Sequence, residues 1–220
     1  MSARKSNKLL SLIFAVAMVV LIITVSISLP IYIREFYYLH VRALDLPGET
    51  GWTYEEIVTA YDETLDYLTI DGKEFSTGVL KYSEEGKSHF EDCKGLFDLN
   101  KCALILSLGV VVLLGLVDKM RLIRLAKPFG LRLSFWSGLL TLLGFASLGV
   151  VCAQDFSRAF TVFHKIFFPG KDNWMFHPKY DQIILVLPQE FFMSCAILIC
   201  ASILLISFTF VLRGIKKRGH

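Results

Sequence analysis

His89 and His164 are the two side chains of this 220-residue sequence best suited to moving protons. Each stands among acidic and aromatic residues, on separate segments that we expect outside the lipid bilayer. A histidine ring can take up and return a proton near neutral pH, so the pair predicts acid–base catalysis. Asp92 follows His89 by three residues and shares its face if the segment is helical, where it could orient the ring. Structural or solvated histidines are the alternative reading.

A zinc site is a competing interpretation, because His89, Asp92, His164 and His177 all carry suitable ligand atoms. The sequence has no HExxH motif, so no metal is expected. A serine hydrolase is disfavoured as well, because no GxSxG motif occurs. Proton transfer between side chains therefore remains the chemistry to test.

The five cysteines do not form a redox or zinc motif, because no CxxC pair occurs. Cys102 and Cys152 fall near the outer ends of two predicted membrane spans, where a disulfide is conceivable. Small buried thiols inside apolar helices are the commoner case. The sequence leaves their pairing open.

The elements that must position these groups are membrane helices. The chain is 54% hydrophobic and 13% aromatic, with a mean hydropathy of +0.55, which is too apolar for an ordinary soluble domain. Spanning a bilayer takes about 20 mostly apolar helical residues. Four segments qualify: about 9–33, 102–117, 133–151 and 191–212. The first is too long for a signal-peptide core and predicts an uncleaved anchor.

Basic residues at the span ends predict the orientation, because lysine and arginine are retained in the cytoplasm. Twelve of the 23 basic residues flank the spans on one side, accompanied by a single acid, Asp118. They are Arg4, Lys5, Lys8, Lys119, Arg121, Arg124, Lys127, Arg132, Arg213, Lys216, Lys217 and Arg218. Both termini are therefore expected in the cytoplasm and both histidines outside. Basic clusters at membrane boundaries attract anionic lipid and do not indicate nucleic-acid binding.

The expected fold is a mainly α integral membrane protein with four transmembrane helices and a small extracytoplasmic cap. We divide the chain into an anchor helix (1–33), a cap segment (34–100), the second and third spans with their basic link (101–152), a second outer loop (153–190), and the fourth span with a basic tail (191–220). The cap segment is too short for a large core of its own, so it must pack on the membrane helices.

Local signals mark elements inside the cap segment. Thr53 and Glu56 predict a capping box for an amphipathic helix over 53–68. Asp71-Gly72 lies between two short candidate strands, residues 67–70 and 73–75, and is consistent with a short hairpin. Ser88 and Glu91 form a second capping-box pattern, which would start a helix at Ser88 and place His89 in its first turn.

The second outer loop begins with a helical stripe of aromatic residues. His164 lies at the edge of this stripe, which stops at Pro169-Gly170, and Pro188 marks the entry to the fourth span. So aromatic a loop predicts a surface that dips into the membrane interface, either to handle lipid or only to anchor the loop. The stripe comprises Phe156, Phe160, Phe163 and Phe167.

Two sequence blocks resemble the bacterial lipoprotein intramolecular transacylases, a family of four-span membrane enzymes that make lyso-form lipoproteins. One is SHFEDCK at 88–94, which is similar to the family's His-x-x-Asp block. The other is FHKIFFPG at 163–170, continuing through Trp174, Phe176, Asp181 and the PQEFF stretch at 188–192. The resemblance covers essentially the whole chain. Phe90 and Cys93 depart from the Met and Val common in the family.

The resemblance implies transfer of the sn-2 acyl chain of a diacylglyceryl-modified lipoprotein to the α-amine of its N-terminal cysteine. The family's two functional histidines correspond to His89 and His164, with Asp92, Trp174 and Asp181 as supporting residues. Donor and acceptor belong to one molecule, so no cofactor is needed. A helix starting at Ser88 would favour neutral His89 as the base, although the sequence leaves the two roles open.

The implied partners are the lipoprotein substrate and membrane lipid, with no nucleic acid, and the implied location is the bacterial cytoplasmic membrane with the active site facing outside. The alternative is a non-catalytic membrane protein that binds lipoproteins or senses the cell envelope. In that case the outer loops are a docking surface, and both histidines tolerate substitution.

Overall fold

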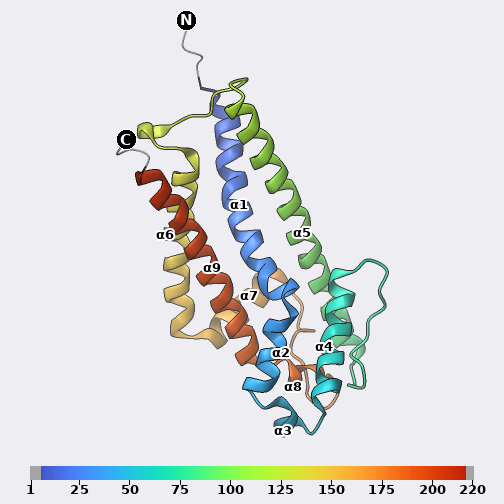
Figure 1. Ribbon diagram of the computed structural model, residues 1–220. Helices are drawn as coiled ribbons and strands as arrows, with labels where there is room; N and C mark the ends of the chain where they lie inside the picture. Colours follow the sequence, from blue (N-terminus) through green and yellow to red (C-terminus); the bar gives the residue numbers. More distant parts are fainter. Residues whose placement is uncertain (1–5, 217–220) are drawn as a thin grey trace, which may run out of the picture. The chain divides into compact units, whose positions relative to one another are not determined.

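A computed structural model describes residues 6–216 of the chain, and those residues form helices and loops with no strand (Figure 1). Arg4, Lys5, Lys217 and Arg218, which belong to the predicted basic flanks, lie outside the described residues. The elements in chain order are α1 (Lys8–Tyr32), α2 (Arg34–Ala43), α3 (Leu46–Thr50), α4 (Tyr54–Thr69), α5 (Glu84–Lys119), the 3₁₀ turn η1 (Pro128–Gly130), α6 (Leu133–Gln154), α7 (Phe156–Phe167), α8 (Ile183–Val186) and α9 (Gln189–Lys216).

Four of these helices, α1, α5, α6 and α9, are long and apolar enough to cross a membrane, which confirms the four predicted spans. The chain is a multi-pass membrane protein. In α5 the second span continues without a break into the predicted outer segment. Its first part, residues 84–101, is rich in Asp, Glu and Lys, and its apolar stretch begins at Cys102. We therefore place residues 84–101 outside the span.

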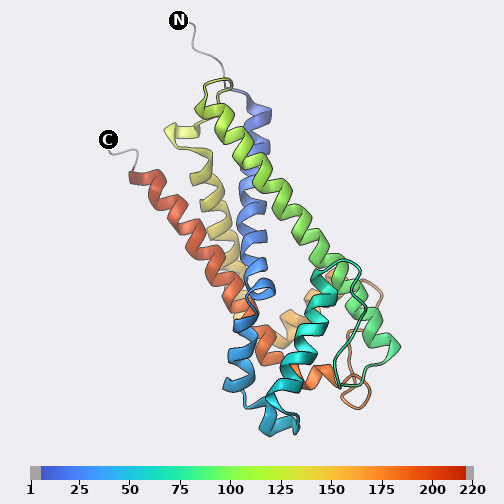
Figure 2. The ribbon, with the colours of Figure 1, turned by 45° about the vertical axis from the view of Figure 1, so that its right-hand side comes forward.

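One compact unit consists of residues 1–28, 100–151 and 198–220 and contains the apolar parts of the four long helices. Small residues bring these helices close together. The Ser137 hydroxyl of α6 donates a hydrogen bond to the Ala15 carbonyl oxygen of α1, at 3.0 Å. A Cβ atom on Gly138 would lie 2.9 Å from the Ser207 carbonyl oxygen of α9, so only glycine allows this approach of two helices that run side by side (Figures 1 and 2).

The second compact unit consists of residues 29–99 and 152–197 and contains α2, α3, α4, α7 and α8. Tyr37 lies at its centre, fully buried, with its ring stacked on that of Tyr61 at 3.8 Å. The Tyr37 hydroxyl donates a hydrogen bond to the Val186 carbonyl oxygen at 2.7 Å. This side chain joins α2 and α4 to α8, so the predicted cap segment shares its core with the second outer loop.

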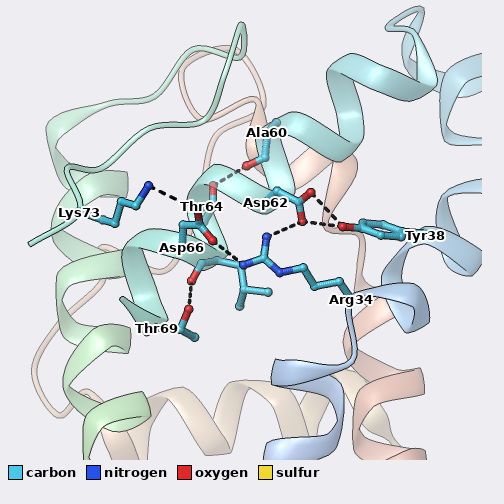
Figure 3. Close-up of polar contacts among 9 residues, drawn as sticks. Arg34, Tyr38, Ala60, Asp62, Thr64, Asp66, Thr69 and Lys73 are labelled. Atoms are coloured by element: carbon cyan, nitrogen blue, oxygen red, sulfur yellow. Dashed lines mark hydrogen bonds and ion pairs between the residues drawn. The ribbon is translucent and has the colours of Figure 1, made fainter. Parts of the chain in front are cut away.

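Polar contacts on the surface of this unit fix α4. The predicted capping box forms at its start, because the Thr53 hydroxyl accepts the Glu56 N–H while the Glu56 side chain accepts the Thr53 N–H. In Figure 3, the guanidinium of Arg34 lies between two carboxylates of α4 and forms ion pairs with Asp62, at 2.9 Å, and with Asp66. One cation at the start of α2 thereby bridges two successive turns of α4.

The predicted hairpin at Asp71-Gly72 is wrong. Gly72 does occupy a turn with a φ of +77°, but the segment that follows bonds to side chains of α4 instead of forming a strand pair. The Glu63 carboxylate accepts hydrogen bonds from the Ser76 hydroxyl at 2.5 Å and from the Gly78 N–H at 2.9 Å. The turn residues thus mark a reversal of the chain. The segment after it satisfies its polar groups by hydrogen bonds to side chains of α4 and not by pairing with a second strand.

Candidate active site

His89 is positioned by the start of α5, which lies earlier than predicted. The helix begins at Glu84, and the Ser83 hydroxyl caps it by accepting the Gly86 N–H at 3.0 Å. The N–H and the hydroxyl of Ser83 in turn both donate to Oδ1 of Asp181, at 2.8 and 2.7 Å. The expected helix start at Ser88 is therefore wrong, because Ser83 together with Asp181 supplies a stronger cap. His89 lies in the second turn.

Gly86 makes this cap possible. A Cβ atom at residue 86 would lie 2.1 Å from Oδ1 of Asp181, well inside contact distance. The Asp181 side chain is only 6% exposed, so it has no room to move aside. Asp181, predicted as a supporting residue, thus anchors the helix that carries His89, and within residues 6–216 its side-chain hydrogen bonds go to Ser83 instead of an imidazole.

His164 is carried by α7, a helix with one apolar and one polar face. Asp155 caps its start by accepting the Arg158 N–H at 2.9 Å, and the helix ends at Phe167, just before Pro169-Gly170 as predicted. His164 is 6% exposed, whereas four large apolar side chains of the same helix are exposed. These are Val162, Phe163, Ile166 and Phe167. The helix turns its histidine inward and leaves an apolar face uncovered.

The structure brings the two predicted histidines together. Their ring centroids are 5.7 Å apart, with 33° between the ring planes, although 75 residues separate them in the sequence. Both rings are buried, and Phe168 contacts both, with centroid distances of 5.0 Å to His89 and 5.8 Å to His164. A single reacting centre could lie within hydrogen-bonding reach of both imidazoles.

The hydrogen bonds of His164 determine which of its nitrogens carries the proton. Nδ1 lies 2.7 Å from the Phe160 carbonyl oxygen, one turn earlier in α7. A carbonyl oxygen only accepts, so Nδ1 must donate, and in the neutral ring Nε2 is then an unprotonated acceptor. The Trp174 indole stacks on this imidazole at 4.6 Å and 28°. His164 therefore offers a lone pair on a ring that is held from two sides.

Within the described part of the chain, the ring of His89 makes a single polar contact. Its Nε2 lies 3.4 Å from the Cys93 Sγ, one turn later in α5. Its Nδ1 is buried without a hydrogen-bond partner among the described residues. Buried polar atoms without partners are rare, and they recur where a substrate supplies the partner. The ring of Phe176 also packs against this imidazole, with 5.5 Å between the two ring centroids.

Burial keeps both imidazoles neutral near neutral pH. The pKa of His89 is lowered to about 4, chiefly because the ring is removed from water and secondly because of the neighbouring His164; the Asp92 carboxylate acts in the opposite direction. Burial also lowers the pKa of His164, against the effect of its hydrogen bond to Phe160. One neutral ring can accept a proton while the other donates one.

Asp92 lies beside the histidines but bonds elsewhere. Lys171 Nζ donates to its Oδ1 at 2.5 Å, and Asn173 Nδ2 donates to its Oδ2 at 3.1 Å. Asp92 therefore ties α5 to the loop after α7, and the expectation that it hydrogen-bonds an imidazole is not met. The same loop carries Trp174, whose Nε1–H donates to the Lys171 carbonyl oxygen at 3.1 Å.

The other predicted groups lie apart from this pair. His177 is exposed, and its Nδ1 accepts the Lys179 N–H at 3.2 Å. Within residues 6–216, no group of three or more His, Cys, Asp or Glu side chains is placed to hold a metal ion. Cys102 and Cys152 are both free thiols.

Sequence reasoning did not predict the contacts that complete the site, although Cys93, Phe168 and Phe176 belong to the two blocks. Cys93 and Lys171 have polar contacts there, Phe168 and Phe176 enclose the rings, and Asn173 joins the Asp92 contact. All five lie within or close to the two blocks that carry the family resemblance. Their position in the sequence was therefore a usable signal, although no periodic pattern identified their roles.

Comparison with known proteins agrees with the resemblance carried by the two sequence blocks. A family model described as lipoprotein intramolecular transacylase matches residues 12–192. The solved structure of the membrane-integral lipoprotein intramolecular transacylase from Bacillus cereus is 26% identical in sequence, with a TM-score of 0.84 over 96% of both chains. Two variants of that protein, with a histidine replaced by arginine or by alanine, give TM-scores of 0.77 at 25% identity, over 96% of this chain and 92% and 94% of theirs. A search of curated proteins found no match.

Proposed function

The chain belongs to the lipoprotein intramolecular transacylase family, and from this premise we propose that His89 and His164 catalyse its acyl transfer. The substrate is a lipoprotein whose N-terminal cysteine carries a diacylglyceryl group. The sn-2 acyl chain leaves its glyceryl oxygen and becomes attached to the α-amine of the same cysteine, giving the lyso form. The observation that carries the proposal is the pair of buried neutral imidazoles with ring centroids 5.7 Å apart.

The reaction needs few catalytic groups because both reacting groups belong to one molecule. Holding them in the attacking geometry supplies effective molarities of about 10⁵ to 10⁸ M. What remains is to remove a proton from the amine, to stabilise the oxyanion that forms on the ester carbonyl, and to protonate the departing glyceryl oxygen. Two imidazoles provide all three functions without a nucleotide or a metal.

We assign His164 as the base. Its Nδ1 is occupied by the Phe160 carbonyl oxygen, which leaves the Nε2 lone pair to accept the proton that the amine loses as its nitrogen bonds to the acyl carbon. Stacking on Trp174 favours the resulting imidazolium through a cation–π interaction. The earlier preference for His89 assumed a helix start at Ser88, and α5 begins at Glu84 instead.

We assign His89 as the hydrogen-bond donor. Its buried Nδ1 has no hydrogen-bond partner among residues 6–216, which suits an atom whose partner is the developing oxyanion. When the tetrahedral intermediate collapses, the bond between acyl carbon and glyceryl oxygen breaks, and that oxygen takes a proton from the histidine pair. The net result is one ester broken, one amide formed, and the amine proton transferred to the new hydroxyl.

Asp92, Trp174 and Asp181 support this chemistry by holding the two helices in place. Asp181 fixes the start of α5 through Ser83, and Asp92 fixes the loop that brings Trp174 onto His164. We therefore assign the two carboxylates as positioning residues.

Membrane lipid is the proposed partner of α7. Its exposed apolar face is bordered on one side by Arg158 and Lys165, an arrangement that suits a helix lying in the membrane interface with its basic side chains reaching toward the headgroups. Such a position would place His164 at the depth where the ester of a diacylglyceryl group lies. Together with the basic residues at the span ends, it supports cytoplasmic termini and a site facing outside in the bacterial cytoplasmic membrane.

Mass spectrometry of a reporter lipoprotein tests the function. Cells or vesicles containing this protein should convert the reporter's N-terminal peptide from an O-acylated to an N-acylated form, and His89→Ala and His164→Ala should each reduce the rate by about 10² to 10⁴. His177→Ala is the matched control, since this exposed histidine lies on the same loop outside the site. Full conversion by either site variant would refute the assignment, and a reporter left unchanged by the wild-type protein would favour a binding role.

A further inference from the structure

The contact between Cys93 and His89 has a chemical consequence that packing does not require. The two residues are one helical turn apart in α5, and the Cys93 Sγ lies 3.4 Å from Nε2 of the imidazole. This is the only hydrogen-bond contact of the His89 ring with the residues that the structure describes. The proton shared across this contact decides which ring nitrogen is free to donate.

Two proton arrangements fit the distance. If Nε2 carries the ring proton, the thiol sulfur must accept it, and Nδ1 is left as a bare acceptor. If the thiol donates, Nε2 is the acceptor and the ring proton lies on Nδ1. Burial raises the pKa of the Cys93 thiol to about 12, so the sulfur keeps its hydrogen. A neutral imidazole nitrogen is a much better acceptor than a thiol sulfur, so the second arrangement is favoured.

We propose that Cys93 is a positioning residue that holds neutral His89 in the tautomer with its proton on Nδ1. The consequence for catalysis rests on the function proposed above. In this tautomer the buried, unpartnered Nδ1 presents a hydrogen to the oxyanion, whereas the other tautomer would present a lone pair and repel it. Cys93 thus performs for His89 the role that the Phe160 carbonyl oxygen performs for His164.

Packing alone is the alternative role for this thiol. Cys93 packs against the apolar core of its unit, as Phe97 and Phe176 do. A residue that only fills space there can be replaced by valine, of similar size, without moving a proton on the imidazole. The position of the proton on the His89 ring therefore distinguishes a positioning role of Cys93 from packing alone.

The test is ¹⁵N NMR of histidine-labelled protein in detergent, for the wild type and for Cys93→Val and Cys93→Ser. We expect the His89 signals of the wild type and of Cys93→Ser, which keeps an O–H donor, to show a protonated Nδ1. Cys93→Val should shift the proton toward Nε2. Cys102→Val, at an exposed cysteine of the same helix, should leave the spectrum unchanged.

Kinetics with a lipidated reporter peptide provide the second readout. A hydrogen bond of this kind biases the tautomer by a factor of about 3 to 10. Cys93→Val should therefore lower kcat about 3- to 10-fold with KM unchanged, and Cys93→Ser should restore most of the loss. A wild-type ring spectrum in Cys93→Val, or equal losses of kcat in both variants, would overturn the proposal. If His89→Ala kept full activity, the proposed function would fail while the tautomer measurement still stood.

Discussion

Acidification should destabilise the folded protein through His89 over a defined pH window. The folded protein lowers the pKa of this imidazole to about 4, whereas a histidine in an unfolded chain has a pKa of about 6.5. Between these values the unfolded chain binds a proton at residue 89 and the folded protein does not. The stability contribution is therefore complete above about pH 7 and is lost as the pH falls toward 4.

The size of the effect follows from the width of the window. One pKa unit corresponds to about 1.4 kcal/mol, so the full window is worth about 3 kcal/mol, of which about 2.5 kcal/mol is lost by pH 4.5. For a chain of this size, 1 kcal/mol shifts the thermal midpoint by roughly 2–4 °C. His89 alone should then account for a fall of about 5–10 °C between pH 7.5 and pH 4.5.

Thermal unfolding in detergent at the two pH values isolates this contribution when the wild type is compared with His89→Gln, which is neutral throughout. The fall in the thermal midpoint of the variant should be about 5–10 °C smaller than that of the wild type. His177→Gln, a substitution at an exposed site, should behave like the wild type. An equal pH dependence of His89→Gln and the wild type would show that His89 is not held neutral by burial.

Three further substitutions test the surroundings of the site and of α4. Trp174→Leu should lower kcat between about 2-fold and 30-fold by removing the stack on His164, and Trp174→Phe should retain most activity; equal losses would exclude a stacking role. Gly86→Ala should lower the thermal midpoint by roughly 2–12 °C because its Cβ would overlap the carboxylate that anchors α5, whereas Gly95→Ala, which meets no atom within 4 Å, should not lower it. Arg34→Ala should cost about 1 kcal/mol in unfolding experiments at low salt, with the difference shrinking at high salt if the ion pairs to α4 are responsible.

Features that depend on neighbouring residues were predictable from the sequence. The four apolar spans are confirmed because twenty apolar residues leave few alternatives to a membrane helix. The capping box at Thr53 and Glu56 is confirmed because both partners lie within one turn. The same reasoning failed at Ser88, where the local pattern was present but lost to a cap that depends on Asp181, about a hundred residues away. The orientation of the spans stays a prediction from charge.

The candidate site was predictable in its residues but not in its connections. The resemblance named His89 and His164, and the fold brings their rings together. The partner of Asp92, by contrast, comes from a loop without periodicity. Nothing in the sequence therefore indicated that Asp92 would hydrogen-bond to Lys171 instead of an imidazole. The contact of Cys93 with His89 was not predicted either, although the two residues are close in sequence. A spacing of four residues on a helix is so common that it suggested no special role.

Each of the two imidazoles is oriented from within its own helix, His164 by a carbonyl oxygen one turn before it and His89 by a thiol one turn after it. These two hydrogen-bond contacts consequently do not depend on how the two helices pack against each other. The separation of the two rings depends on tertiary structure, and the loop that Lys171 ties to α5 contributes to it. The same loop also places Trp174 against His164. The separation of the rings and the orientation of each ring can therefore change independently. Substitutions in the loop that keep Trp174 would alter the separation, and with it the size of the group accepted, while both proton-transfer groups stay unchanged.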